Sequence, residues 1–372
     1  MTPEEKIREL LALADVKLNG PNPWDIQVHD ERFYHRVLGH ASMGVGESYL
    51  EGWWDSPQLD EFFHRIQRAE LAKHVKSLEL FWLSWRSRLF NLQEGPHSKQ
   101  VARQHYDIGN DLYCVMLDKH MQYTCAYWQD ANNLEDAQER KMNLICRKLH
   151  LEPGMRVLEL GGGFCGLARF IAREYGCEVV SYNISKEQVQ FGREFCNGLP
   201  VRIEEKDYRE AIHEPEQFDR AVAVGLCEHI GYKNYRPFLE LVRAKLKRSG
   251  LFLLHTIGGN RSRTSTDPWV DKYIFPNGVV PSIAQLGRAM ENLWVVEDWH
   301  NFGPDYDKTL QAWWKNFEAR YCTLDKKRYD QRFFRMWKLY LMMSAGAFRA
   351  RRMQLWQIVL STGAIANYEP VR

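Results

Sequence analysis

The sequence predicts an α/β fold: a doubly wound, mostly parallel sheet preceded by a small, mainly helical N-terminal domain. From about residue 134 onward, strand-like and helix-like segments alternate, and such alternation indicates parallel strands covered by helices on both faces. Residues 1–95 instead contain short elements interrupted by Gly, Pro and Asn, followed by a helical period at 59–92. Gly and Pro at 94–98 break that helix, so we expect domains at 1–95 and 96–372.

The composition is that of a globular protein and excludes several classes of function. The 372 residues correspond to about two domains, and 45% of them are apolar. Lys and Arg number 50 against 48 Asp and Glu, and this balance argues against nucleic-acid binding. No apolar run approaches the roughly 18–20 residues of a membrane span. The eight cysteines form no CxxC pair, which favours reduced thiols and predicts no metal site.

The individual elements follow from their periods and their flanking residues. The N-terminal MTPEEKIRELLALA has acids in its first turn and is expected to be a helix rather than a signal peptide. Residues 134–150 carry apolar side chains at spacings of three and four, and Pro153-Gly154 ends that helix. The segments that follow are predicted as strands at 157–160, 177–182, 220–225 and 251–256 and as helices at 167–176 and 185–197.

A glycine loop connects the first predicted strand to the following helix. Gly161, Gly163 and Gly166 have the spacing of a dinucleotide-binding loop, in which glycines let a ligand approach the backbone amides. A nicotinamide enzyme places an acid about 20 residues further on, where this chain has Ser-Tyr-Asn at 181–183. An S-adenosylmethionine site is therefore favoured, with Glu159 fixing the loop. A nicotinamide site and a loop without a ligand remain the alternatives.

Ionisable side chains follow two further predicted strands. Glu228 comes after the strand at 220–225, and His255 lies at the end of the strand at 251–256. Because the carboxyl ends of parallel strands meet in one crevice, we expect both side chains to contribute to one site. Taken alone, either residue is more simply a hydrogen-bonded buried polar group.

The stretch from Lys315 to Arg352 is basic and rich in aromatic residues. It contains 11 Lys and Arg against 3 Asp and Glu. Such a surface suits an anionic membrane face, and we expect lipid contacts around Arg349, Arg351 and Arg352. The alternative is a solvated helix face whose long side chains cover the core.

Nine segments along nearly the whole chain together resemble the cyclopropane fatty acid synthases of the bacterial, phospholipid-acting type. They are MGVGESYLEGWWD (43–55), HYDIGND (105–111), MQYTCAYW (121–128), LEPGMRVLEL (151–160), GLCEHIG (225–231), LLHTIG (253–258), DPWVDKYIFPNG (267–278), EDWHNFGPDYDKTL (297–310) and AGAFRARRMQLWQ (345–357).

The resemblance implies a fold of the S-adenosylmethionine-dependent methyltransferase (Rossmann-like) type and a specific reaction. A methylene group would pass from S-adenosylmethionine to the cis double bond of unsaturated acyl chains in membrane phospholipids. A bound bicarbonate would deprotonate the intermediate carbocation as the ring closes. The resemblance also implies a homodimer, and a cytoplasmic protein associated peripherally with the inner face of the membrane. Methyl branching by the same transfer and a lipid-binding homologue with a decayed loop are the alternatives.

The resemblance further assigns site residues by position. The bicarbonate would be held by Cys125 (largely through its backbone), Glu228, His255, the backbone of Ile257, and Tyr306. The cofactor would contact Tyr123, Thr124, Glu159, Gly161, Gly162, Gly163, Asn183, Ile184, Gln188, Asp207 and Tyr208. Two residues depart from the family pattern. Ser344 stands where the family often has a cysteine, which we expect to matter little. Cys165 stands where a glycine is expected, and its Cβ is predicted to crowd the methionine part of the cofactor.

Overall fold

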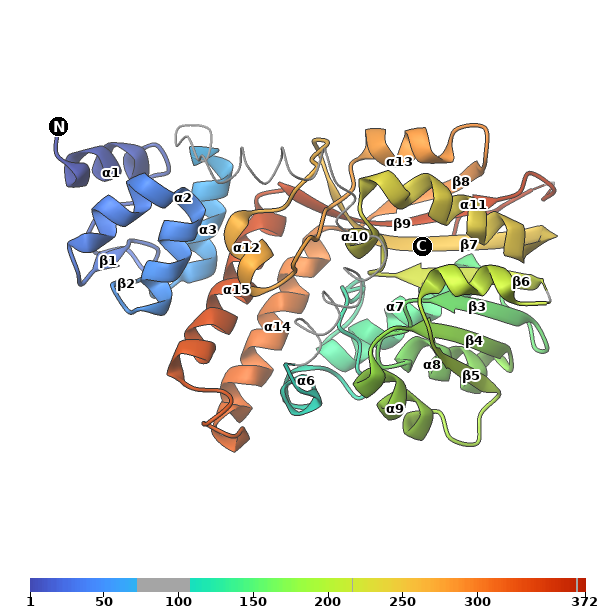
Figure 1. The fold of residues 1–372 in the computed structure, drawn as a ribbon. Helices are drawn as coiled ribbons and strands as arrows, with labels where there is room; N and C mark the ends of the chain where they lie inside the picture. The colour runs from blue at the N-terminus through green and yellow to red at the C-terminus, as the bar shows by residue number, and fades with distance from the viewer. Residues whose placement is uncertain (72–107, 216, 366) are drawn as a thin grey trace. The chain divides into compact units, whose positions relative to one another are not determined.

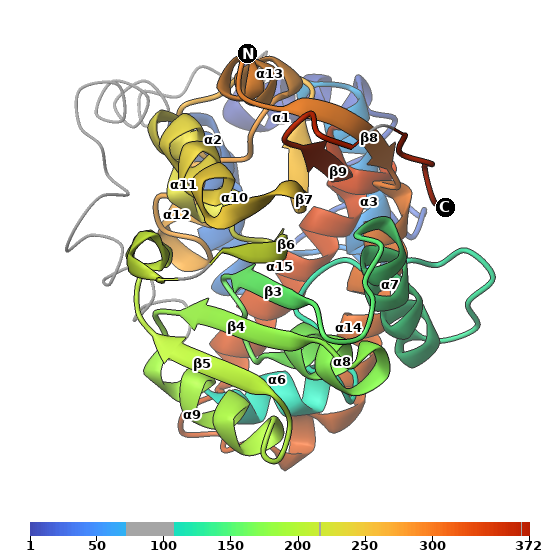
Figure 2. The same cartoon turned by 90° about the vertical axis from the view of Figure 1, so that its right-hand side faces the viewer.

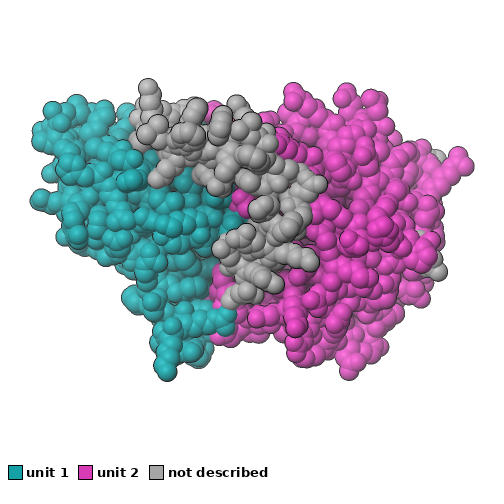
Figure 3. All heavy atoms as spheres, viewed as in Figure 1, with its two compact units in different colours: residues 1–90, 265–276, 306–353 teal, residues 91–264, 277–305, 354–372 magenta. Residues whose placement is uncertain are grey.

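The computed structural model describes residues 1–71, 108–215, 217–365 and 367–372. The chain folds into two compact units, each assembled from segments far apart in the sequence (Figure 3). Unit 1 comprises Met1–Phe90, Ser265–Pro276 and Tyr306–Met353, and unit 2 comprises Asn91–Thr264, Asn277–Asp305 and Gln354–Arg372. The predicted linker at 94–98, the boundary after residue 95 and the second half of the predicted helix at 59–92 lie outside the described residues.

Unit 1 is mainly helical. The predicted N-terminal helix is present and begins with a capping box, in which Thr2 and Glu5 each accept a hydrogen bond from the other's backbone N–H. The two short strands of this unit pair with each other in antiparallel fashion. Its elements are α1 (Pro3–Ala12), β1 (Gln27–Val28), α2 (Arg32–Leu50), β2 (Trp54–Asp55), α3 (Leu59–Arg68), α12 (Pro268–Tyr273), most of α14 (Pro304–Arg320), and α15 (Gln331–Arg349).

The core of unit 1 forms where α15 packs against α3. Gly346 lets the two backbones approach, because a Cβ at this position would lie 2.6 Å from the backbone nitrogen of His64 and 2.7 Å from the carbonyl oxygen of Asp60. Phe62 and Phe63 of α3 are buried in the same unit. A helix from residue 331 onward therefore completes a core that begins near the N-terminus.

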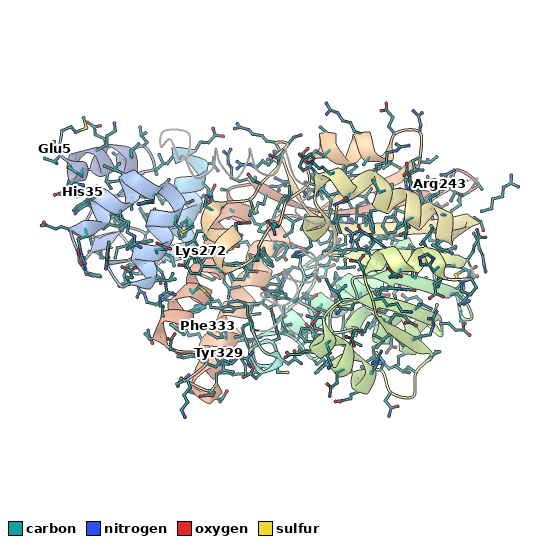
Figure 4. All side chains as sticks on the ribbon, in the orientation of Figure 1. Glu5, His35, Arg243, Lys272, Tyr329 and Phe333 are labelled. Atoms are coloured by element: carbon teal, nitrogen blue, oxygen red, sulfur yellow. The ribbon has the colours of Figure 1, made fainter. Side chains whose placement is uncertain are left out.

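Two arginines that were expected to face a membrane form ion pairs inside unit 1. Arg349 lies 2.7, 2.8 and 3.2 Å from three carboxylates of the unit, and Arg352 pairs with Glu70. The expectation that these two arginines contact lipid is wrong, because their charges are neutralised within the unit. Tyr329 and Phe333 mark the connection between α14 and α15 (Figure 4). Arg351, the third arginine of that expectation, is exposed, and its contact with lipid stays a prediction. The other exposed bases of the stretch lie in and around the connection between α14 and α15: Lys315, Arg320, Lys326, Lys327, Arg328 and Arg332.

Unit 2 is built on a seven-stranded sheet with the order β5-β4-β3-β6-β7-β9-β8 (Figures 1 and 2). Neighbouring strands from β5 to β7 pair in parallel, and β8 pairs antiparallel with β9. The strands are β3 (Arg156–Leu160), β4 (Glu178–Asn183), β5 (Val201–Glu205), β6 (Phe218–Val224), β7 (Leu246–Gly259), β8 (Val295–Asn301) and β9 (Met353–Ser361). The helices are α6 (Asn110–Met116), α7 (Leu134–Lys148), α8 (Gly166–Tyr175), α9 (Lys186–Phe195), α10 (Cys227–Ile230), α11 (Tyr235–Lys245) and α13 (Ile283–Met290).

Alternate residues of the central strands enter two separate cores. Leu158 and Leu160 of β3 pack in a core that includes side chains of α11 and α13. Val157 of the same strand packs in a second core, which includes side chains of α7, α8 and α9. Helices therefore cover both faces of the sheet, and the predicted doubly wound, mostly parallel fold is confirmed.

The predicted strands at 157–160, 177–182, 220–225 and 251–256 are β3, β4, β6 and β7, and the three predicted helices of this region are α7, α8 and α9. The sequence patterns did not predict β5, β8 or β9. The eight cysteines are free thiols, as expected.

Candidate active site

A buried carboxylate lies directly against the glycine loop that follows β3. Gly161 and Gly163 have φ angles of +81° and +53°, which glycine adopts without strain. A Cβ on Gly162 would lie 2.0 Å from the hydroxyl of Ser181 and 2.6 Å from Glu159 Oε2. The Ser181 hydroxyl donates to that same carboxylate at 2.5 Å, and burial raises the pKa of Glu159 to about 7. Glu159 thus lies directly against Gly162 of the loop, and its role in fixing the loop stays a prediction.

Asn183, at the end of β4, ties the loop to the next helix. Its amide nitrogen donates to the carbonyl of Gly163 at 2.8 Å and to Gln188 Oε1 at 2.9 Å, and its oxygen accepts from the backbone N–H of Ser185. Asn183 and Gln188 are buried, and Ile184 between them is half-buried. Three of the residues assigned to the cofactor are therefore brought to the glycine loop.

Asp207 and Tyr208 follow β5, the strand next to β4. The Asp207 carboxylate accepts from the backbone N–H of Arg209 at 3.0 Å and from its guanidinium at 2.9 Å. The ring of Tyr208 packs edge-on against Phe238 in the core, with the centroids 5.4 Å apart. The carboxyl ends of β3, β4 and β5 thus each carry residues assigned to the cofactor.

The segment from 118 to 125 lies against the same loop and the end of β6. A Cβ on Gly166, the first residue of α8, would lie 1.8 Å from the carbonyl oxygen of His120. A Cβ on Gly225, directly after β6, would lie 3.1 Å from the methyl group of Thr124. The ring of Tyr123 packs against Tyr113 at 5.0 Å. Both cofactor residues assigned to this segment therefore lie near the carboxyl ends of the strands.

Two side chains of α7 that the sequence did not single out hold this segment. Gln138 Nε2 donates to the carbonyl oxygens of Thr124 at 2.9 Å and Gln122 at 3.3 Å. Lys141 Nζ donates to the side chains of the same two residues. Gln138 and Lys141 are both fully buried. The sequence pattern gives no signal for them, because polar residues of an amphipathic helix are expected on its solvent face.

Cys165 lies in the core rather than in the space above the loop. It has a φ of +60° at the start of α8 and is fully buried. Its sulfur packs against Gly192 of α9. A Cβ added to Gly192 would lie 2.7 Å from this sulfur. Because no part of Cys165 is open to solvent, it does not narrow the space that a ligand enters. The expectation of crowding is therefore wrong.

Glu228 and His255 meet at the ends of β6 and β7. Glu228 Oε1 accepts from the backbone N–H of Ile257 at 2.7 Å, while the backbone N–H of Gly225 donates to the carbonyl of His255 at 2.9 Å. Glu228 Oε2 and His255 Nε2 are buried and have no hydrogen-bond partner. Each of these buried, unpartnered polar atoms is costly unless a ligand completes it, and the two residues lie at the ends of neighbouring strands.

Burial sets the protonation of both groups. It raises the pKa of Glu228 to about 7 and, together with the nearby charges of Lys141 and Lys148, lowers the pKa of His255 well below its usual value. Gln357 Nε2 lies 3.4 Å from His255 Nδ1. With the amide donating to Nδ1, the imidazole proton resides on Nε2, and the pocket presents one donor and one acceptor.

The remaining two residues assigned to the anion are also buried. Cys125 directly follows Thr124 and is fully buried in unit 2. Tyr306 belongs to unit 1, where its ring stacks on Phe348 at 4.4 Å and meets Trp313 edge-on at 6.1 Å. The participation of Tyr306 in the site of unit 2 stays a prediction.

Comparison with known proteins identifies the family. The model of the family "Mycolic acid cyclopropane synthetase" matches residues 93–358. The cyclopropane-fatty-acyl-phospholipid synthase of Escherichia coli (strain K12) is 48% identical over 360 residues, which cover 95% of this chain and 92% of the relative. The tuberculostearic acid methyltransferase UfaA1 of Mycobacterium tuberculosis is 31% identical over 87% of this chain and 80% of the relative.

Solved structures agree with this assignment. Mycolic acid cyclopropane synthase CmaA1, crystallised with SAH and CTAB, superposes with a TM-score of 0.63 at 26% identity and covers 72% of this chain and 99% of its own. Coclaurine N-methyltransferase has the same fold, with a TM-score of 0.68 at 17% identity and coverage of 86% and 99%. A nicotinamide enzyme is thereby excluded. The chain belongs to the mycolic acid cyclopropane synthetase family and is an S-adenosylmethionine-dependent methyltransferase.

Proposed function

We propose that this enzyme converts the cis double bonds of unsaturated fatty acyl chains in membrane phospholipids into cyclopropane rings. The observation that carries the proposal is the buried pair of unpartnered atoms, Glu228 Oε2 and His255 Nε2, at the strand ends that also carry the glycine loop. Identity of 48% with a cyclopropane-fatty-acyl-phospholipid synthase supports the substrate class.

In the proposed complex, the residues around the glycine loop bind S-adenosylmethionine. Asn183 already holds the backbone of the glycine loop by a hydrogen bond to the carbonyl of Gly163, so little ordering is needed when the ligand enters. We assign Asp207, beyond β5, to the polar groups of the nucleoside. The segment at 123–124 lies near the loop and would cover the methionine part.

The donors and acceptors of the second pocket fit a bicarbonate ion. A bicarbonate carries an O–H donor, which Glu228 Oε2 accepts, and oxygen acceptors, which suit the N–H of His255. The backbone of Cys125 and Ile257 and the hydroxyl of Tyr306 are the further ligands that we assign. When bound, S-adenosylmethionine supplies the methyl group, and bicarbonate takes up the proton released as the ring closes.

The chain's own side chains must protect and orient a carbocation during this reaction. Water has to be excluded from the cation, and aromatic faces stabilise it by cation–π attraction. The ring of Phe302 lies 5.9 Å from His255 and 5.2 Å from Tyr127. Only the ionised form of Glu228 accepts a proton, and this form predominates above about pH 7.

Access to phospholipids requires contact with a bilayer. Within the described part of the chain, no helix has the length and apolar character of a membrane span. We assign docking to the exposed bases in and around the α14–α15 connection (Lys315, Arg320, Lys326, Lys327, Arg328 and Arg332), which would meet anionic headgroups. The enzyme would then act as a homodimer in the cytoplasm, at the inner face of the membrane.

The product distinguishes ring closure from its closest alternative. The protein is incubated with unsaturated phospholipid vesicles and methyl-labelled S-adenosylmethionine, and the acyl chains are analysed by mass spectrometry and proton NMR. A gain of one CH2 with cyclopropane resonances supports the proposal. A methylene-branched product, or a product with two further hydrogens, favours methyl branching, which the relation to a tuberculostearic acid methyltransferase keeps as the alternative.

A further inference from the structure

One fully buried lysine in unit 2 has no ionic partner. Lys141 Nζ donates to Gln122 Oε1 and, at 3.0 Å, to Thr124 Oγ1, and both acceptors are uncharged. No carboxylate among the described residues lies within 4.0 Å of this nitrogen to form an ion pair. Burial lowers the pKa of Lys141 to about 8, so the side chain still carries its charge at pH 7. Burying such a charge is expensive unless something nearby compensates it.

A second lysine of the same helix shows the usual solution. Lys148 lies two turns further along α7 and is equally buried, but its Nζ is 3.0 Å from a carboxylate oxygen of Asp298. The charge of Lys148 is therefore neutralised by a direct ion pair. Lys141 differs from Lys148 in this respect, although the two share helix, depth and residue type.

The charge of Lys141 lies near Glu228 and His255. Thr124, which receives a hydrogen bond from Lys141, directly precedes Cys125. The charges of Lys141 and Lys148 both contribute to lowering the pKa of His255. The carboxyls of Asp118 and Glu159 act on the charge of Lys141 without an ion-pair contact, whereas Lys148 contacts the carboxylate of Asp298 directly. A neutral imidazole and an unpartnered carboxyl oxygen therefore lie in the field of a buried cation that has no carboxylate in contact.

We propose that Lys141 is a positioning residue whose positive charge holds bicarbonate in this pocket without touching it. The inference rests on the proposed function, because it takes the pocket to be an anion site. The bound anion in turn is the counter-ion of Lys141. This reciprocal stabilisation explains why a lysine, rather than a glutamine, occupies the buried face of α7.

A purely structural role for Lys141 predicts a different result. If Lys141 only fastened the segment at 122–124, its loss would release Tyr123 and Thr124 and weaken the binding of S-adenosylmethionine. If its charge is what matters, its loss weakens the binding of an anion but not of the sulfonium, which is itself a cation. The two ligands therefore respond in opposite ways under the two hypotheses.

The experiment measures both affinities in the full-length protein. Binding of 13C-labelled bicarbonate is followed by 13C NMR in the presence of S-adenosylhomocysteine, and binding of S-adenosylmethionine is followed by calorimetry. Lys141→Gln and Lys141→Met should each weaken bicarbonate binding by about tenfold or more, as expected for loss of a nearby buried charge. Their affinity for S-adenosylmethionine should stay within about twofold or increase.

Two matched variants serve as controls. Lys148→Gln removes a buried lysine that also acts on His255 but is paired directly with Asp298, so it should weaken bicarbonate binding less than Lys141→Gln does. Thr124→Val keeps the charge of Lys141 and removes one hydrogen bond, so bicarbonate should still bind. This variant also keeps the proposal testable if the Lys141 variants do not fold.

Several outcomes would overturn the proposal. Equal bicarbonate affinity in wild type and Lys141→Gln would remove the role of the charge. Loss of bicarbonate binding in Thr124→Val, or weaker S-adenosylmethionine binding in Lys141→Gln, would show that Lys141 acts only by holding the segment at 122–124 through its hydrogen bonds. Absence of bicarbonate binding to the wild-type protein would instead refute the anion site of the proposed function, and this inference with it.

Discussion

Replacing Glu228 by glutamine tests the centre of the proposed chemistry. The amide has nearly the shape of the carboxyl group and can still accept the hydrogen bond from the backbone of Ile257, which is 2.7 Å long in the wild type. At the position of Oε2 the amide carries an NH2 group, which can neither take a proton nor accept a hydrogen bond. We expect turnover to fall by about 10²–10⁴-fold, the usual contribution of a positioned acid or base. The affinity for S-adenosylmethionine should change little.

The same variant has a calculable effect on stability. Burial raises the pKa of Glu228 from 4.5 to about 7, and this difference corresponds to about 3 kcal/mol. The folded protein keeps a proton that the unfolded chain loses, so the contribution of Glu228 to stability falls as pH rises from 4.5 to about 7. Glu228→Gln does not titrate and should gain up to about 3 kcal/mol on the wild type across this window.

Two measurements and one control variant check this reasoning. Transfer of labelled methyl groups to unsaturated phospholipid vesicles gives the rate, which in the wild type should rise with pH through about 7 as Glu228 ionises, and which in the variant should be flat. Chemical denaturation from pH 4.5 to 8 gives the stability. Glu159→Gln is the matched control, since this residue is also buried with a pKa of about 7 but lies against the cofactor loop; it should weaken cofactor affinity more than turnover.

The outcome with carbonate-free buffer decides between two bases. Under the proposed chemistry, removal of dissolved carbonate slows the wild-type enzyme reversibly. Full activity without carbonate, combined with inactivity of Glu228→Gln, would identify Glu228 as the direct base and refute the bicarbonate role. An active Glu228→Gln variant would refute the assignment of this residue altogether.

S-Adenosylmethionine or S-adenosylhomocysteine should raise the melting temperature by mass action, and NADH should not; a shift with NADH alone would contradict the family assignment. Cys165→Gly should leave cofactor affinity within about twofold, whereas Gly192→Ala should destabilise the fold through its 2.7 Å contact with the sulfur and be rescued in the double variant, with a coupling of about 1 kcal/mol or more. Changing the three bases at 326–328 to Gln should lower sedimentation with anionic vesicles at low salt. Arg349→Gln, which breaks internal ion pairs, should lower stability instead.

The strands that the sequence predicts are those buried on both faces. Leu251–Leu254 is an unbroken run of apolar residues, all of them buried. Such a run is typical of a strand that is covered on both faces. β5 reads VRIEE and lies at one edge of the sheet, where most of its side chains are not buried. β9 contains the buried residues Gln354 and Gln357. In both strands the polar residues interrupt the pattern of apolar residues that is typical of a strand. Their β-structure is therefore evident only from the strands with which they pair.

The site was predictable where it follows from topology. Glu228 and His255 come directly after or at the end of strands, and parallel strands bring such positions together. Lys141 was not predictable, because it lies within a helix whose pattern reads as amphipathic. Its burial depends on a segment some 20 residues earlier in the chain, which packs on the side of α7 that a lone helix would expose. Likewise, no local pattern shows that 265–276 and 306–353 belong with the N-terminal segment in unit 1.

The packing of α15 against α3 constrains how the protein is made. During synthesis on the ribosome, the buried residues of α3, Phe62 and Phe63, emerge long before α15 (Gln331–Arg349), whose Gly346 seats against them. The nascent N-terminal segment must therefore wait, with apolar surface uncovered, until nearly the whole chain has been translated. We expect chaperones that shield apolar surface to bind this segment during translation. A fragment that ends before residue 331 lacks the helix needed to close this core, so its N-terminal unit would be left incomplete.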